Sequence, residues 1–165
     1  MGTFAVQIAT AFGAKVTGVC STRNLEMVRS IGAVHVIDYT REDFARTGQR
    51  YDLIYDTVGN RPIADYQRAL HPHGKCVIIG FGGMRRMAEY MLFGPRVSKP
   101  GGQQIGLQGT ASVQQNDLFT LKELIETAKI IPVVDRTLEK AADAVRYLEQ
   151  GHAEGKVFIT IQAAG

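Results

Sequence analysis

The sequence predicts an α/β fold built around a doubly wound, mostly parallel sheet. Apolar runs of strand length alternate with helical patterns along most of the 165 residues, and this alternation is typical of parallel strands joined by crossover helices. The length is that of one domain with a sizeable core. The chain also opens inside a helical pattern rather than on a strand.

The first part of the chain predicts helix, strand, helix and strand. Residues 3–12 carry the apolar spacing of a helix that ends at a glycine. The apolar run 15–20 predicts a strand. Asn24 is expected to cap a helix over 24–31, and residues 34–37 are expected to form a short strand.

The middle part predicts two further strands separated by a helix. The run 52–56 (DLIYD) predicts a strand. A helix is expected over 62–70, because proline is tolerated in a first turn. The turn 71–74 (HPHG) then precedes the strongest strand pattern of the chain, 75–80 (KCVIIG).

The last part is less regular at its start. Residues 84–102 contain Gly94-Pro95 and a second proline-glycine cluster, so we expect a helix fragment and a long loop. An amphipathic helix is predicted over 116–129. The remaining expected elements are strands at 104–108, 130–134 (an edge strand, because it contains Pro132) and 156–161, and a helix at 138–149.

Charge and cysteine content exclude several classes of function. The net charge is +3 and the basic residues are dispersed, so nucleic acid is not an expected partner. Cys20 and Cys76 lie in apolar runs with no metal-ligand spacing around them, which predicts free thiols, no metal site and a cytoplasmic location. No apolar run is long enough to span a bilayer and no leader pattern is seen, so no membrane association is expected.

A small polar cluster follows the strand 15–20. It consists of Ser21, Thr22, Arg23 and Asn24. In a dinucleotide-binding α/β unit, the tip of the second strand meets the adenosine ribose, where a carboxylate suits the 2′-OH of NAD, and hydroxyls with an arginine suit the 2′-phosphate of NADP. No Asp or Glu occurs within the cluster, so NADP(H) is the predicted cofactor. The alternative is a solvated strand-to-helix turn.

Five segments, taken together and in order, resemble the medium-chain dehydrogenase/reductase superfamily, in particular its zinc-free NADPH:quinone oxidoreductase branch. They are GTFAVQIATAFGAKVTGVCSTRN, IGAVHVIDYT, YDLIYDTVGN, ALHPHGKCVIIGFGG and GHAEGKVFITI. The resemblance implies a Rossmann-like fold. It also implies direct hydride transfer from NADPH to a small-molecule quinone, enone or related carbonyl acceptor, with no catalytic side chain expected.

The same resemblance implies further cofactor contacts. Gly2 corresponds to the last glycine of the family's glycine-rich turn, and Tyr39 corresponds to a tyrosine near the adenosine phosphate, although an ordinary half-buried tyrosine fits equally well. Lys156 corresponds to a basic residue that reaches the cofactor, while Glu154 stands where arginine is common, which weakens that assignment. The loops expected beneath the cofactor and beside the nicotinamide comprise Thr57, Val58 and Gly59, and Gly80, Phe81, Gly82 and Gly83.

The resemblance further implies an incomplete enzyme. Members of the family are about twice as long and carry a preceding catalytic domain, a first strand and a glycine-rich turn. We therefore expect residues 1–129 to form an incomplete dinucleotide-binding domain and residues 130–165 to pack on the missing catalytic domain, and we expect this chain alone to be inactive. A truncated product, an expressed fragment and an incomplete gene all fit this interpretation.

Loss of a central strand would expose two apolar strand edges. We expect either direct closure of the gap or association between chains into a dimer or other homo-oligomer, with residues 103–109 at the family's dimer edge. Two alternatives to an oxidoreductase half stay open. One is a non-catalytic nucleotide-binding or dimerisation module. The other, ranked last, is a methyltransferase-like domain, whose second strand normally ends in a carboxylate where this chain has Ser21.

Overall fold

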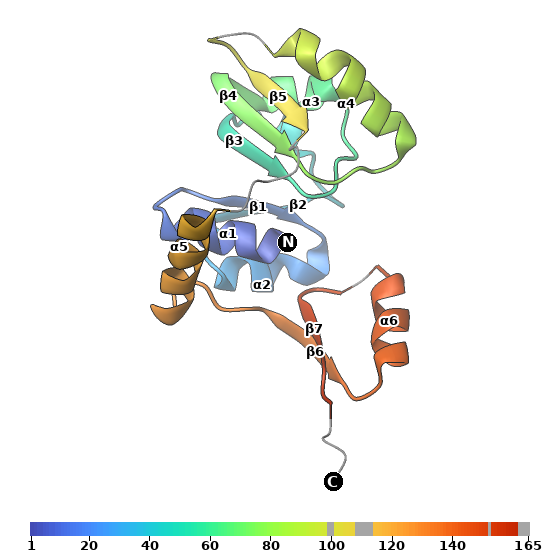
Figure 1. Cartoon of the computed structure of the whole chain (residues 1–165). Helices are drawn as coiled ribbons and strands as arrows, with labels where there is room; N and C mark the ends of the chain where they lie inside the picture. Colours follow the sequence, from blue (N-terminus) through green and yellow to red (C-terminus); the bar gives the residue numbers. More distant parts are fainter. Residues whose placement is uncertain (99–100, 108–113, 152, 162–165) are drawn as a thin grey trace. The chain divides into compact units, whose positions relative to one another are not determined.

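The computed structural model describes residues 1–98, 101–107, 114–151 and 153–161 (Figure 1). The chain separates into two compact units. The first unit contains Met1 and residues 19–22 and 37–118. The second unit contains residues 2–18, 23–36 and 119–165.

A three-stranded parallel sheet organises the first unit. Its strand order is β3-β4-β5, and the register aligns Ile54 with Cys76 and Cys76 with Ile105. These side chains and the fully buried Tyr66 belong to one apolar core, which also receives side chains of α3 and α4. The elements are β3 (Tyr51–Asp56), α3 (Ile63–Ala69), β4 (Leu70–Ile78), α4 (Met84–Val97) and β5 (Gln104–Leu107), with a 3-10 turn at Phe44–Arg46.

The second unit combines helices with a second parallel strand pair, β6 and β7. Helix α1 is tied to the segment before β6 by the side chain of Gln7, which donates to the carbonyl of Ile131 (3.0 Å) and accepts from its amide (2.7 Å). The elements are α1 (Gly2–Ala11), α2 (Leu25–Ser30), residues 119–126 of α5 (Gln115–Glu126), β6 (Val134–Leu138), α6 (Ala141–Glu149) and β7 (Lys156–Ile159). Strands β1 (Thr17–Cys20) and β2 (His35–Asp38) form a separate two-stranded sheet.

The predicted α/β class with parallel pairing is confirmed, but the strand predicted at 130–134 is wrong. Strand β6 begins at Val134 and continues to Leu138, where a helix start was expected. The backbone of Ile131 is hydrogen-bonded to the Gln7 side chain instead of to a neighbouring strand, and Pro132 has no amide hydrogen to donate to a ladder. The local apolar pattern therefore misplaced the strand by several residues.

Two other elements differ in extent from the prediction. Helix α4 runs for 14 residues through Gly94-Pro95, where only a fragment was expected. Pro95 has no amide hydrogen to donate to the carbonyl of Met91, and the helix ends two residues later, at Val97. The predicted turn 71–74 lies inside β4, where the register jumps from Tyr51↔Leu70 to Leu53↔Lys75. The chain thus passes from α3 into β4 without a separate loop.

The described strands form three separate sheets. Direct pairing that would close the predicted gap is not seen among them, so association between chains stays a prediction. Strand β5 is an end strand of its sheet, as expected for a dimer edge, although Gln108 and Gly109 of the predicted interface lie outside the described residues. No helix in the described part of the chain is long and apolar enough to cross a membrane.

The two cysteines differ in exposure, because Cys20 is partly exposed and Cys76 is buried. Cys76 is 3% exposed, and burial, with a smaller contribution from the charge of Asp56, raises the pKa of its thiol to about 12. Because the thiolate is the reactive form, we expect iodoacetamide at mildly alkaline pH to modify Cys20 and leave Cys76 intact. Peptide mass spectrometry before and after unfolding in urea measures this. Equal modification rates for the two native thiols would contradict the buried position of Cys76.

Candidate functional site

A buried carboxylate joins the tips of β1 and β2. Asp38, the last residue of β2, is 9% exposed. Its Oδ2 accepts a hydrogen bond from the Thr22 hydroxyl at 2.5 Å, and its Oδ1 accepts from the backbone amide and the hydroxyl of Thr40 at 2.9 and 2.7 Å. The hydrogen bonds from Thr22 and then Thr40 are the main causes that lower the pKa of Asp38. This carboxylate is therefore ionised at neutral pH and accepts hydrogen bonds through both oxygens.

The predicted residues Ser21 and Tyr39 of the first unit lie next in the chain to Thr22 and Asp38. The amide of Tyr39 donates to the carbonyl of Cys20 at 3.0 Å, which holds the two tips together, and the Tyr39 side chain is 55% exposed. Ser21 is half-buried. Arg41 adds an exposed guanidinium 3.7 Å from Asp38. Neither Asp38 nor Arg41 was among the residues predicted from the sequence.

Sequence reasoning missed Asp38 because it considered only the residues that directly follow β1. In parallel strands the carboxyl ends meet at one edge of the sheet. A carboxylate at the end of the next predicted strand was thus the signal that could have identified it.

The loops that follow β3 and β4 pack backbone against backbone. The amide of Gly82 donates to the carbonyl of Gly59 at 2.9 Å. The carboxylate of Asp56, at the end of β3, accepts from the amides of Val58 (2.7 Å) and Gly59 (2.9 Å). Its second oxygen accepts from the buried hydroxyl of Tyr66 at 2.6 Å. The loop after β3 is therefore fixed by side chains of its own unit.

The loops after β3 and β4 cross at Gly59 and Gly80, and both positions require glycine. Gly59 has a positive φ of 63°, and a Cβ on it would overlap the carbonyl oxygen of Gly80. A Cβ on Gly80 would in turn overlap the carbonyl oxygen of Thr57. Val58 and Phe81 are 55% and 45% exposed beside these glycines. The crossing thus presents backbone groups and apolar side chains at the carboxyl ends of β3 and β4, where ligands of open α/β sheets bind.

The remaining predicted residues lie in the second unit. The guanidinium Nε of Arg23 lies 3.7 Å from a carboxylate oxygen of Glu154, and the two side chains are 47% and 39% exposed. Lys156 places its ammonium 5.3 Å from the ring centre of Phe4. Gly2 is the first residue of α1. Asn24 occupies the N-cap position of α2, although its side chain makes no capping hydrogen bond.

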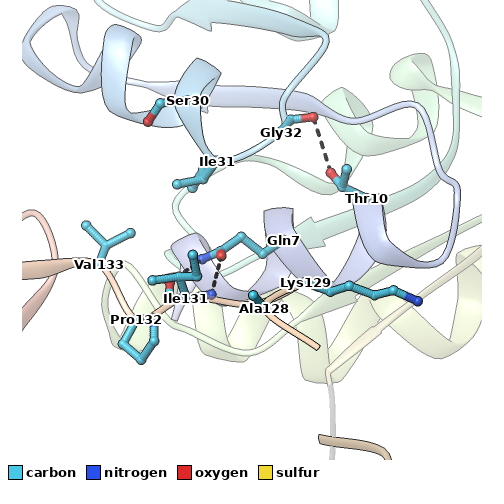
Figure 2. Close-up of a pocket in the computed structure, with 10 residues that line it drawn as sticks. All are labelled: Gln7, Thr10, Ser30, Ile31, Gly32, Ala128, Lys129, Ile131, Pro132 and Val133. Carbon is cyan, nitrogen blue, oxygen red and sulfur yellow. Dashed lines mark hydrogen bonds between the residues drawn. The ribbon is translucent and has the colours of Figure 1, made fainter. Parts of the chain in front are cut away.

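A pocket of about 430 Å³ also lies in the second unit (Figure 2). The Gln7–Ile131 hydrogen bonds close one side of it, and the Thr10 hydroxyl donates to the carbonyl of Gly32 at 3.2 Å on another. Its lining contains none of the predicted cofactor residues. The lining residues are Gln7, Thr10, Ser30, Ile31, Gly32, Ala128, Lys129, Ile131, Pro132 and Val133. They precede β1, β2 and β6 in the chain, whereas ligands of such sheets bind where the strands end.

The chain is similar to several oxidoreductases. The sequence model of the zinc-binding dehydrogenase family matches residues 31–159. The NADPH-dependent alkenal/one oxidoreductase of Arabidopsis thaliana is 31% identical over 96% of this chain and 37% of its own length. The NAD-dependent alcohol dehydrogenase of Sulfolobus acidocaldarius is 32% identical over 98% of this chain and 47% of its own length. The chain therefore spans about half or less of the curated relatives it matches.

Solved structures show the same fold. The quinone oxidoreductase of Coxiella burnetii superposes with a TM-score of 0.72 at 23% identity, covering 96% of this chain and 49% of that one. The name of the family mentions zinc, and the described residues contain no group of three or more His, Cys, Asp or Glu that could hold a metal ion. The match over residues 31–159 confirms the predicted resemblance, and the chain belongs to the zinc-binding dehydrogenase family of the medium-chain dehydrogenase/reductase superfamily.

Proposed function

We propose that this chain is the NADPH-binding half of an oxidoreductase that transfers hydride to a quinone, an enone or a related carbonyl acceptor. The observation that carries the proposal is the backbone crossing of Gly59 and Gly80 at the carboxyl ends of β3 and β4, in a chain of this family. The relatives' names support it, because they include an NADPH-dependent alkenal/one oxidoreductase and a quinone oxidoreductase homologue.

The exposed groups of the predicted cofactor residues suit the parts of a large anionic cofactor with flat rings. Val58 and Phe81 supply apolar surface beside the loop crossing, and Tyr39 supplies an exposed aromatic ring at the tip of β2. Arg23 supplies a half-exposed guanidinium, whose fork geometry suits a phosphate. The bound NADPH would supply the hydride, and the residues of this chain would bind and orient it.

The roles proposed for most of the individual residues follow from the strand ends at which they lie, and those of Gly2 and Lys156 follow from the family resemblance. Thr57, Val58 and Gly59 would lie beneath the cofactor, and the backbone of Gly80, Phe81 and Gly82 would approach the nicotinamide. The tip of β1, Ser21 to Asn24, would bind the adenosine ribose and its 2′-phosphate, with Tyr39 beside it. Gly2 and Lys156 would contribute the remaining contacts.

We propose no general acid or base in this half, because direct hydride transfer needs positioning above all. In the intact enzyme, residues 1–129 would form the dinucleotide-binding domain and residues 130–165 would pack on the catalytic domain, which would supply much of the acceptor pocket. This chain alone would then bind cofactor without turnover. We further propose a cytoplasmic homo-oligomer that associates through the β5 edge.

Replacing Arg23 with alanine is expected to weaken NADPH binding by about 10- to 100-fold, because charge-assisted hydrogen bonds to the 2′-phosphate would be lost. NADH binding should change little. Isothermal titration of the 165-residue chain with each nucleotide measures both constants. Arg29→Ala is the matched control, since Arg29 pairs with Glu26 on α2 and is not assigned to the site.

An equal loss of NADPH and NADH affinity in Arg23→Ala would contradict the phosphate contact. Absence of binding to either nucleotide by the unmodified chain would overturn the proposed function and favour a non-catalytic module. Binding of S-adenosylmethionine alone would favour the methyltransferase-like alternative. Measurable reduction of a quinone by the pure chain would contradict the proposal that this half is inactive.

A further inference from the structure

The hydroxyl groups at the strand tips have an orientation that constrains any ligand. A threonine hydroxyl carries one hydrogen to donate and two lone pairs that accept. Thr22 donates its hydrogen to Asp38 Oδ2, and Thr40 donates its hydrogen to Asp38 Oδ1. The single hydrogen of each hydroxyl is therefore already donated to the Asp38 carboxylate.

A ligand that contacts these two hydroxyls meets acceptors rather than donors. The oxygens of Thr22 and Thr40, 3.3 Å apart, can offer it only lone pairs, and Asp38 adds a negative charge directly behind them. A phosphate dianion needs hydrogen-bond donors, whereas a ribose hydroxyl is itself a donor. The hydroxyl pair thus suits a free 2′-OH better than a 2′-phosphate.

The guanidinium of Arg41 only partly offsets the charge of this carboxylate. Arg41 lies 3.7 Å from Asp38 and its side chain is 77% exposed, so solvent screens the pair strongly. Arg23, which we propose as the phosphate contact, lies 3.7 Å from a carboxylate oxygen of Glu154. Within the first unit, the charge that a phosphate would meet is therefore a balance between Arg41 and the Asp38 carboxylate.

We infer that Asp38 is a specificity-determining residue that acts through Thr22 and Thr40 and lowers the preference of this chain for NADP(H) over NAD(H). The inference rests on the proposed function, because it assumes a nicotinamide dinucleotide at the strand tips. Asp38 is a positioning residue: it fixes which way two hydroxyls point, and its charge disfavours an added phosphate. Specificity obtained by disfavouring one ligand is common at binding sites.

The substitution Asp38→Asn tests the inference with little change of shape. The side-chain amide donates to one hydroxyl oxygen, so that hydroxyl must turn its own hydrogen toward the ligand, and the negative charge is removed. We expect the ratio of the NAD⁺ to the NADP⁺ dissociation constant to rise by about tenfold. Isothermal titration with both nucleotides measures this ratio, which a general loss of structure would leave unchanged.

Asp43→Asn is the matched control for this variant. Asp43 is also a carboxylate of the first unit, where it accepts from the amide of Ala45 and pairs with Arg61. It belongs to the 3-10 turn at Phe44–Arg46 rather than to a strand tip. We expect the ratio of the two dissociation constants in Asp43→Asn to equal that of the unmodified chain.

A second variant keeps the inference testable if Asp38→Asn fails to fold. Thr22→Val removes an acceptor for the ribose hydroxyl, so we expect NAD⁺ affinity to fall by about fivefold and more than NADP⁺ affinity. A larger loss of NADP⁺ affinity would show that Thr22 donates to the phosphate and would overturn the inference.

An unchanged ratio in Asp38→Asn would overturn the inference while leaving the proposed function intact. Absence of binding to both nucleotides by the unmodified chain would overturn the two together. The two failures are thus distinguished by a single set of titrations.

Discussion

Substituting Asp56 with alanine is expected to lower the free energy of unfolding by about 2–4 kcal/mol. The carboxylate accepts from the amide of Gly59 and from the hydroxyl of Tyr66, which is fully buried. After the substitution the Tyr66 hydroxyl would retain only a long contact of 3.4 Å to the hydroxyl of Tyr90. The free-energy cost of leaving a buried donor without an acceptor is larger than the net free energy that one hydrogen bond contributes to folding.

Tyr66 remains a donor over the whole working pH range. Burial, and then the hydrogen bond to Asp56, raise the pKa of Tyr66 far above its ordinary value, so its hydroxyl is protonated at neutral and mildly alkaline pH. The effect of Asp56→Ala should consequently be independent of pH there. Urea unfolding followed by circular dichroism measures it.

Asp52→Ala is the control for this prediction, because Asp52 lies on the same strand and is exposed. It should shift stability by no more than about 0.5 kcal/mol. Asp56→Asn should fall between the two, since one amide oxygen can still accept from the loop. Equal unfolding midpoints for the Asp56→Ala and Asp52→Ala chains would contradict the role assigned to this carboxylate.

The elements that the sequence predicted well are those defined by local pattern. Helix α1 was expected at 3–12 and lies at Gly2–Ala11, and β3 was expected at 52–56 and lies at Tyr51–Asp56. In both, apolar periodicity and a bounding turn residue act within a few positions of each other. No distant contact was needed to place them.

The strand that the sequence analysis misplaced depends on a contact between residues far apart in the chain. The segment before β6 follows the hydrogen bonds between Gln7 and Ile131, which join opposite ends of the sequence. Local apolar content at 130–134 resembles a strand and contains no information about that side chain. A single long-range side-chain interaction therefore overrode the local preference.

The residues of the candidate site also divide into those that local sequence predicted and those that depend on distant partners. The glycines at the loop crossing follow predicted strands and were identified from the sequence, and Gly59 and Gly80 do meet in the structure. The partners of the polar tip residues were not identified, because Asp38 reaches Thr22 from the next strand and Glu154 reaches Arg23 from near the end of the chain. The local sequence shows which residues lie at a strand tip. The partners of their hydrogen bonds and ion pairs depend on which distant segments lie beside that tip.

Replacing Gly59 with alanine should destabilise the chain by about 2–4 kcal/mol and weaken nucleotide binding in the molecules that remain folded. The positive φ of 63° is unfavourable for any residue with a Cβ, and that Cβ would overlap the Gly80 carbonyl oxygen. Relief requires one loop to move away from the other. Movement of the loop after β4 would displace the backbone that we propose beside the nicotinamide.

A comparison with two other glycines separates the cost of the positive φ from the cost of the Cβ overlap. Gly13 has a similar φ of 80° with nothing within 4 Å of an added Cβ, so Gly13→Ala should cost only about 1 kcal/mol. Gly106 has open space and no positive φ, so Gly106→Ala should be close to neutral. Urea unfolding measures the stability of the three variants, and NADPH titration measures their binding, so the two contributions can be separated. If Gly59→Ala lost no more stability than Gly13→Ala, the overlap would be absorbed without loop movement, and binding should then be unaffected as well.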